Sequence, residues 1–169
     1  MDEQKGTVSR AEAVKAVTDM SRRVALLHMC YARTLVDELG PEQGTQLIKK
    51  AIRAYGTKVG ERMRERARSL GLEPNVENFG KVADLPSLAF DDSFSIVDGE
   101  PHSWAHSCTL AELWQEYGED ELGSLYCLVD PAKMEAYNPS WTQVHSKKII
   151  DGDEYCERVA RPVSRESKT

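Results

Sequence analysis

Cysteine and histidine side chains in the second half of the chain are the residues best suited to chemistry. One residue separates His106 from Cys108, so an extended segment would place both side chains on the same face. Thr109 and Glu112 have the spacing of a capping box and predict a helix that begins beside Cys108. The start of a helix lowers the pKa of a thiol. The pair therefore predicts a nucleophile and its base, while two metal ligands or a small buried cysteine also fit.

Cys127 and Cys156 extend this pattern, because three of the four cysteines and His106 fall within positions 106–156. These four side chains are acceptable zinc ligands. The chain has no Cys-x-x-Cys pair, however, and His-x-Cys is too close for most tetrahedral sites. We therefore predict no cofactor, with zinc at His106, Cys108, Cys127 and Cys156 as the alternative.

Two aspartates accompany these cysteines. Asp130 lies three residues after Cys127, and Asp153 lies three residues before Cys156. Either carboxylate could orient a histidine or act as a base. A simple turn after the Asp-Gly dipeptide at 151–152 would also explain Asp153.

Contacts to a substrate are expected from two further places. Tyr137 and Asn138 precede Pro139 in a predicted turn, which either presents two polar side chains or only reverses the chain. Arg53 and Tyr55 belong to a predicted helix. Because a planar guanidinium matches two carboxylate oxygens, Arg53 is a candidate carboxylate anchor, although a solvated helix arginine is an equally good interpretation.

The elements that must position these residues begin with a helical half, residues 1–74. We predict three helices there, at about Ser9–Asp19, Ser21–Leu39 and 41–70. Gly56 and Gly60 lie four residues apart on the third helix, a spacing that indicates close approach of another backbone or of a ligand. Apolar residues recur at helical spacing, as Val24, Leu27, Tyr31, Leu35 and Leu39 in the second helix, and as Ile48, Ile52, Tyr55, Val59, Met63 and Leu70 in the third.

The sheet-and-helix half, residues 92–162, changes to the pattern of strands. A strand from Asp92 and a return at 102–107 flank a predicted turn, and a helix is expected from Thr109 to Gly118. Residues 121–137 fit a helix or a strand, and two final strands are expected at 141–149 and 155–162.

This order of elements predicts the fold class. Helices come first, followed by mostly antiparallel strands with one or two inserted helices, which is typical of an α+β fold. We expect a single domain over residues 1–169, with a frayed tail at 163–169.

Charge is divided unevenly along the 169 residues. The net charge is −6, with 14 Lys and Arg against 10 Asp and Glu in residues 1–74, and 8 against 18 in residues 75–169. Tyr55 is the only aromatic residue in the basic stretch from Lys49 to Arg68. A nucleic-acid site needs a basic face with stacking aromatics, so we predict no nucleic-acid partner. A solvated helix face that also meets a second subunit fits better, which suggests a homodimer through the helical half.

Neither a membrane span nor a signal peptide is predicted. No apolar run approaches the roughly 20 residues that cross a bilayer. The first ten residues, Met1 to Arg10, are polar and charged. We therefore expect no membrane partner, a cytoplasmic location and free thiols.

The second half resembles the L-2-amino-thiazoline-4-carboxylic acid hydrolase family. The likeness extends over about residues 20–160 and is strongest over 104–158, and Thr109 stands where the family often has proline after the first cysteine. The order that carries it is Cys108, a short helix, Leu125-Tyr126-Cys127 with Asp130, Tyr137-Asn138-Pro139, Gly152-Asp153 and Cys156.

The resemblance implies a small-molecule substrate with a cyclic C=N group, opened by hydrolysis. Cys108 would be the nucleophile, His106 or Asp153 would transfer protons, and Arg53 would anchor a carboxylate. Cys127 and Cys156 would complete the pocket. A weaker likeness, in cysteine placement, to vinyl-4-reductase-like domains implies a non-catalytic sensor that binds a small ligand or a metal. An interaction protein with purely structural cysteines is the third interpretation.

Overall fold

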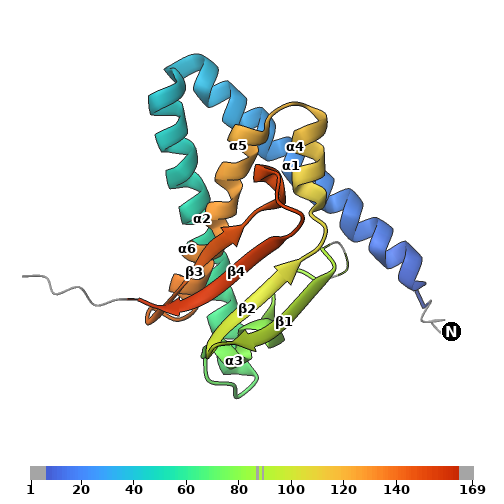
Figure 1. Ribbon diagram of the computed structural model, residues 1–169, viewed down its shortest axis with the longest axis vertical. Coiled ribbons are helices and arrows are strands. Elements are labelled where there is room, and N and C mark those ends of the chain that lie inside the picture. The colour runs from blue at the N-terminus through green and yellow to red at the C-terminus, as the bar shows by residue number, and fades with distance from the viewer. Residues whose placement is uncertain (1–6, 87, 89, 164–169) are drawn as a thin grey trace, which may run out of the picture.

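A computed structural model describes residues 7–86, 88 and 90–163 and shows an α+β fold (Figure 1). Two long helices are followed by a four-stranded antiparallel sheet with short helices inserted between its second and third strands. The helices are α1 Arg10–Leu39, α2 Pro41–Ser69, α3 Val76–Phe79, α4 Thr109–Glu116, α5 Asp120–Ser124 and α6 Val129–Tyr137, with the 3-10 turns η1 Gly80–Val82, η3 Leu125–Leu128 and η4 Ile149–Asp151. The strands are β1 Asp92–Val97, β2 Glu100–Ala105, β3 Trp141–Lys147 and β4 Cys156–Pro162.

Helix α1 is one continuous helix, so the prediction of three helices in residues 1–74 is wrong. The sequence contains no glycine or proline between Arg10 and Leu39, and nothing interrupts the hydrogen-bond ladder near Ser21. The predicted capping box is present, because Ser9 and Glu12 exchange both bonds at the start of the helix. Gly40 separates α1 from α2, as predicted.

The buried face of α1 is not its apolar stripe. Leu27 and Tyr31 are 58% and 67% exposed, whereas the residues that pack inward are Ser21, Ala25, His28 and Ala32. Small side chains allow α2 and α4 to pack closely against this face. The buried Trp114 indole of α4, for example, donates a hydrogen bond to the carbonyl of Ala25. The burial of α1 therefore follows residue size and close packing more than hydrophobicity.

Helices α2 and α6 pack with their backbones almost in contact. A Cβ added to Gly56 would lie 2.6 Å from the Val129 carbonyl oxygen, and one added to Gly60 would lie 2.2 Å from the Lys133 carbonyl oxygen. The prediction of a close backbone approach at these glycines is confirmed. This contact fixes α6, and with it the side chains that α6 turns toward the sheet.

The sheet has the strand order β1-β2-β4-β3, and every neighbouring pair is antiparallel. The predicted hairpins are both present: Asp98 and Gly99 adopt positive φ between β1 and β2, and Gly152 does so between β3 and β4. Figure 1 shows α2 and α6 behind the sheet, so one face of the sheet meets helices. Alternate side chains of β4 point to opposite faces of the sheet. One set is Cys156, Arg158 and Ala160, and the other is Glu157, Val159 and Arg161.

Three inserted helices, one more than predicted, connect β2 to β3. The ambiguous region 121–137 is helical, with Pro131 in the first turn of α6. Helix α4 has Cys108, not Thr109, at its N-cap position, so the predicted capping box at Thr109 does not form. The cysteine side chain therefore lies at the junction between sheet and helix.

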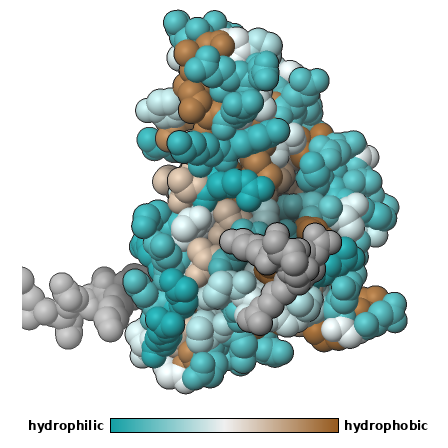
Figure 2. Space-filling model, turned by 90° about the vertical axis from the view of Figure 1, so that its left-hand side faces the viewer, coloured by the Kyte–Doolittle hydropathy of each residue, from teal (hydrophilic) through white to brown (hydrophobic). Residues whose placement is uncertain are grey.

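The surface on the α2 side of the molecule is largely hydrophilic, with separate hydrophobic patches, as Figure 2 shows. Within the part of the chain that the structure describes, no helix has the length and hydropathy of a membrane-spanning segment. Apart from Val163, the tail expected at 163–169 lies outside the described residues.

Candidate functional site

Three of the four cysteines meet where α4, η3 and β4 come together. Cys108 and Cys127 both pack against the hydrophobic cluster around Leu110 and Trp114. The Cys156 sulfur accepts a hydrogen bond of 3.3 Å from the amide of Ile149, which packs against the same cluster. Cys108, Cys127 and Cys156 therefore lie in one region of the structure, while a pocket that they share stays a prediction; Cys30 is exposed on α1.

A network of charged residues lies beside the cysteines, between α6 and the sheet. Its centre is Asp130, in the first turn of α6, whose side chain is only 14% exposed. One carboxylate oxygen lies 3.2 Å from Lys133 Nζ, and the other lies 3.2 Å from His145 Nε2 on β3. Lys133 also contacts Asp84 at 3.3 Å. A buried ionic network is costly to desolvate, so it is weak evidence for stability and a reason to look for function.

The ionisation of Asp130 follows from these contacts. Burial disfavours the carboxylate, but Lys133, His145 and Arg158 together hold the pKa of Asp130 far below its usual range. Asp130 in turn raises the pKa of Lys133 against the effect of burial. Asp130 is therefore a permanent anion that orients His145.

Arg158 and Asp92 form the second part of the network. Arg158 Nη2 donates to Asp92 Oδ1 at 3.2 Å, and the buried Arg158 Nε has no hydrogen-bond partner within the described part of the chain. Partial burial raises the pKa of Asp92, and the Arg158 cation opposes this rise without cancelling it. The network thus contains two carboxylates whose pKa values move in opposite directions.

The thiols do not ionise as predicted from the helix start alone. The amides of Ala111 and Leu110 favour the Cys108 thiolate, but burial outweighs them and raises the pKa of Cys108 to about 11. Burial and the Asp130 charge raise the pKa of Cys127 to about 12, and burial raises the pKa of Cys156. All three are protonated thiols at neutral pH, so a reactive Cys108 needs a base.

Two predicted proton carriers are exposed, whereas the three cysteines are half-buried. His106 is exposed, and its ring lies 5.9 Å from that of Tyr155. Asp153 is also exposed, and its carboxylate accepts the Lys148 amide at 2.8 Å, which stabilises the turn before β4. Among the described residues, His145 is the histidine in direct contact with Asp130.

The residues predicted to bind the substrate through the 137–139 turn and the second long helix lie in different parts of the fold. Tyr137 is fully buried against Phe79 in another hydrophobic cluster, and Asn138 binds the Pro74 carbonyl and the Ser140 amide, as a turn residue does. Arg53 is exposed on α2. The fourth residue, Tyr55, is partly exposed and reaches the cysteine region through Tyr126, whose ring centroid lies 6.2 Å away.

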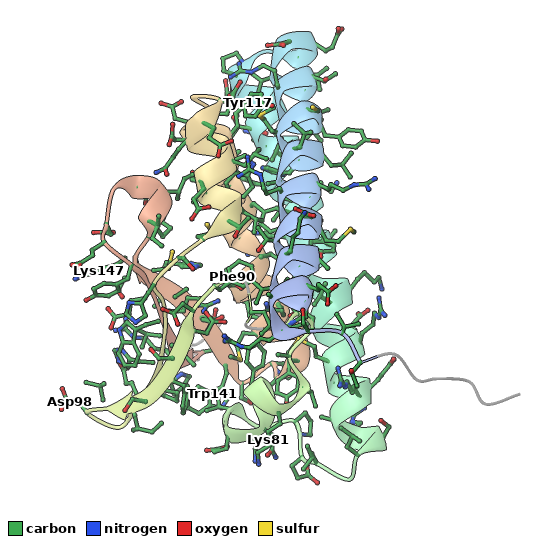
Figure 3. All side chains as sticks on the ribbon, turned by 90° about the vertical axis from the view of Figure 1, so that its right-hand side faces the viewer. Lys81, Phe90, Asp98, Tyr117, Trp141 and Lys147 are labelled. Atoms are coloured by element: carbon green, nitrogen blue, oxygen red, sulfur yellow. The ribbon has the colours of Figure 1, made fainter. Side chains whose placement is uncertain are left out.

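A cavity of about 460 Å³ opens beside the Cys108 segment. Ser107 and Thr109, which flank Cys108, form one wall, while Asp91 and Asp92 at the start of β1 form another. The backbone holds these walls together, because the Ser107 amide bonds the Phe90 carbonyl at 3.3 Å. Figure 3 shows Phe90 between the strand that leads to α4 and helix α1. The remaining wall comes from Leu88 and the first turns of α1, at Arg10, Val14 and Thr18.

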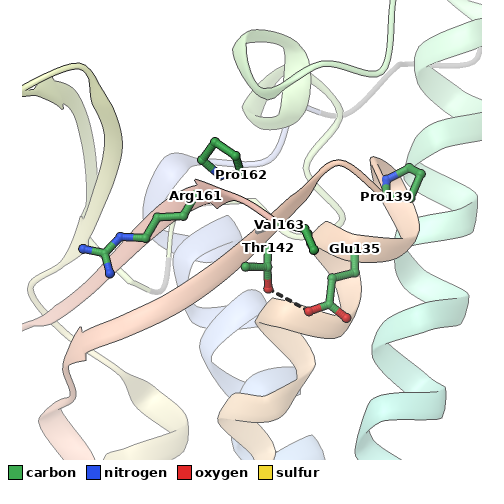
Figure 4. Close-up of a pocket in the computed structure, with 6 residues that line it drawn as sticks. All are labelled: Glu135, Pro139, Thr142, Arg161, Pro162 and Val163. Atoms are coloured by element: carbon green, nitrogen blue, oxygen red, sulfur yellow. Dashed lines mark hydrogen bonds between the residues drawn. The ribbon is translucent and has the colours of Figure 1, made fainter. Parts of the chain in front are cut away.

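A second cavity, of about 550 Å³, lies at the other end of α6 (Figure 4). Its charged side chains already have partners: Glu135 accepts the Thr142 hydroxyl at 2.7 Å, and Arg161 pairs with Glu100. None of the cysteines and not Asp130 lines either of these two cavities, but Ser107 and Thr109, on either side of Cys108, line the one of about 460 Å³. The cavity near Cys108 is therefore the better candidate site.

Metal binding was the alternative for the cysteines and His106. Across residues 7–86, 88 and 90–163, no three His, Cys, Asp or Glu side chains are grouped so that they could hold a metal ion. His106, one of the proposed ligands, is exposed and lies beside Tyr155.

Five residues of the network were missed in the sequence: Asp84, Asp92, Lys133, His145 and Arg158. The i,i+3 spacing of Asp130 and Lys133 on a helix was an available signal. His145 and Arg158 are paired in register on β3 and β4, so their common position beside Asp130 depends on the sheet. Only the assembled structure could show it.

A family model described as L-2-amino-thiazoline-4-carboxylic acid hydrolase matches residues 18–159. This match includes the three converging cysteines and Asp130, His145 and Arg158. No curated protein and no solved structure matches the chain.

Proposed function

Because the chain belongs to the L-2-amino-thiazoline-4-carboxylic acid hydrolase family, we propose that it hydrolyses a cyclic C=N derivative of an amino acid, in the pocket around Cys108, Cys127 and Cys156. The observation that carries this proposal is the meeting of the three cysteines with the buried Asp130 network. Neither feature is needed for a stable core, and together they supply a nucleophile and a means of moving protons.

Cys108 is the proposed nucleophile. It lies at the N-cap of α4, where the amides of Leu110 and Ala111 favour the thiolate, and its neighbours Ser107 and Thr109 line the cavity. Attack of the sulfur on the C=N carbon forms a covalent bond, and a ring bond then breaks as the departing sulfur or nitrogen takes a proton. Water releases the adduct, so the complete reaction consumes one water and needs no oxidant.

The Asp130–His145 pair is the proposed acceptor of the thiol proton. Since the pKa of Cys108 is about 11, few molecules carry a thiolate at neutral pH. A histidine that a permanent carboxylate orients is a suitable base at this pH. Asp130 lies close enough to Cys108 and Cys127 to raise the pKa of both thiols, and this proximity supports a role for His145 near them.

The test is turnover of 2-amino-thiazoline-4-carboxylic acid, followed by mass spectrometry of the ring-opened product. Replacement of Cys108 by serine is expected to lower kcat by at least about 100-fold, because serine is a far weaker nucleophile without a matched base. Cys30→Ser is the matched control, since Cys30 is exposed on α1, and it should keep wild-type activity. Wild-type protein that turns over neither this compound nor related cyclic C=N substrates would overturn the proposal.

A second candidate function is a non-catalytic module that holds a small ligand in the same pocket. The observation that favours it is the raised pKa of all three thiols, which is typical of unreactive, buried cysteines. Equilibrium binding of the thiazoline compound without product formation would support this module. Product formation that depends on Cys108 would exclude it.

A further inference from the structure

We propose that Asp92 is the acid that protonates the departing ring atom, and that Arg158 is the positioning residue that holds Asp92 in place. This inference rests on the proposed hydrolase function and assigns a catalytic role to a residue outside the cysteine cluster. Neither residue was among the candidates from the sequence.

The first support is the position of Asp92. It lies at the start of β1 and lines the cavity of about 460 Å³, together with Ser107 and Thr109 on either side of Cys108. A ligand in this cavity would therefore meet both Asp92 and the residues on either side of Cys108. An acid close to the nucleophile suits a reaction in which one bond forms as another breaks.

The second support is the contact with Arg158. Its Nη2 atom, on β4, donates to Asp92 Oδ1 at 3.2 Å across the intervening strand β2. Most of the Arg158 side chain is buried, and its Nε has no hydrogen-bond partner among the described residues, so the bond to Asp92 and the nearby Asp130 charge hold the guanidinium. The contact uses Asp92 Oδ1, so Oδ2 would carry the proton.

The third support is the difference between the two carboxyl groups of the network. The pKa of Asp130 is held far below its usual range, whereas partial burial raises the pKa of Asp92. Paired carboxyl groups whose surroundings separate their pKa values commonly divide the roles of permanent anion and proton donor. Asp130 fits the first role and Asp92 the second.

The proton balance of the step is simple. As the C–S or C–N bond of the ring breaks, its electron pair moves to the departing atom, which takes the proton from the Asp92 carboxyl. The carboxylate that remains is stabilised by the Arg158 guanidinium. The water that later releases the adduct gives a proton back to Asp92, and the departing Cys108 thiolate takes its proton back from His145. Asp92, Cys108 and His145 thus return to their starting states.

The experiment measures kcat/KM for 2-amino-thiazoline-4-carboxylic acid against pH, in wild type and in Asp92→Asn. The wild-type rate should fall on the alkaline side as Asp92 loses its proton. The Asp92→Asn variant should lose this alkaline limb and at least about 100-fold in kcat, with little change in KM. Asp98→Asn is the control, because Asp98 lies at the tip of the same hairpin, far from Phe90 in Figure 3, and its profile should not change.

Further variants separate catalysis from folding. Asp92→Glu keeps a carboxyl group and should retain the alkaline limb at a reduced kcat. Arg158→Met removes the cation that favours the carboxylate, so the alkaline limb should move to higher pH, and Arg158→Lys should partly reverse this movement. A purely structural role for Arg158 would lower the rate at every pH without moving the limb.

The outcomes distinguish this inference from the function on which it rests. Wild-type turnover together with an unchanged limb in folded Asp92→Asn would overturn the assignment of Asp92 and leave the hydrolase proposal standing. Wild-type protein without turnover would overturn both.

Discussion

Two histidine–carboxylate pairs lie on opposite faces of the sheet. On the helix-facing side, Asp130 Oδ2 lies 3.2 Å from His145 Nε2, with charged neighbours and three thiols around it. On the outer side, Glu157 Oε1 lies 2.9 Å from His102 Nδ1, and the same carboxylate accepts bonds from the neutral donors of Trp104 and Ser146.

The difference shows that a residue pair does not define a site. The outer carboxylate, whose side chain is 18% exposed, is satisfied by His102 and by the neutral donors of Trp104 and Ser146 on neighbouring strands. The inner carboxylate is held between Lys133 and His145 in a region of low solvent access. Its negative charge raises the pKa values of Cys108 and Cys127. Surroundings, not residue types, make the inner pair the candidate for chemistry.

The largest expected effect is on stability. Asp130→Asn should lower the free energy of unfolding by about 3–5 kcal/mol, because it leaves buried cations without their partner. Glu157→Gln should cost only about 1 kcal/mol, since the amide oxygen still accepts a bond. Urea unfolding at pH 7 measures both, and equal losses would contradict the comparison.

The pH dependence of the same variants follows from the pKa of Asp130. A carboxyl group with a lowered folded pKa stabilises the protein above its ordinary value of 3.8, and this stabilisation is lost as the pH falls below that value. The difference between wild type and Asp130→Asn should therefore shrink in strong acid.

The next largest effect is on catalysis. His145→Ala should lower kcat/KM for the thiazoline substrate by about 100-fold, because the thiol would lose its base. His102→Ala, the matched change in the outer pair, should leave kcat/KM unchanged. Steady-state kinetics of both variants provide the test, and an equal loss in His102→Ala would remove the distinction between the two faces.

A smaller effect is expected from the packing of α6. Gly60→Ala would place a Cβ against the Lys133 carbonyl, so we expect a loss of about 1–3 kcal/mol and a disturbed inner pair. Gly80→Ala is the control, because the added Cβ meets no atom within 4 Å and φ is −65°. Thermal unfolding gives the stability of each variant. NMR signals of His145 and His102 should show that only the inner pair responds to Gly60→Ala.

The smallest effect concerns the thiols. Removal of the Asp130 charge should lower the pKa of Cys127 from about 12, so alkylation at a fixed pH should become several-fold faster in Asp130→Asn. Glu157→Gln should leave the rate unchanged.

In wild type, alkylation of Cys108 should rise by about tenfold per pH unit below its pKa of about 11. Mass spectrometry of modified peptides separates the sites, and a plateau near neutral pH would contradict the raised pKa.

Much of the fold could be predicted from local signals. The Ser9–Glu12 capping box, the glycine before Pro41 and the turn glycines 99 and 152 mark element ends through backbone geometry that few other residues adopt. The inward face of α1 could not be predicted from hydropathy, because Ala25 and Ala32 are buried for their size while Leu27 and Tyr31 remain exposed. Close helix packing depends on the partner helices, which the periodicity of one helix does not reveal.

The candidate site could be predicted only in part. Cys108, Cys127, Cys156 and Asp130 were found because they fall in one stretch of sequence that resembles a known family. The contact of His145 with Asp130 and of Arg158 with Asp92 joins residues from different elements. Their pairing depends on strand register and on where α6 lies, and neither leaves a signal at fixed spacing.

The sequence by itself determined the α+β class, the two hairpins and the cysteines that meet, because capping, turn preference and residue type act over a few neighbouring residues. The tertiary structure alone decided the charge states at the site. The helix start favours a Cys108 thiolate locally, but burial by distant segments raises the pKa of that thiol to about 11. Desolvation and ion pairing depend on every residue that surrounds a group, and folding brings those residues together from the whole chain.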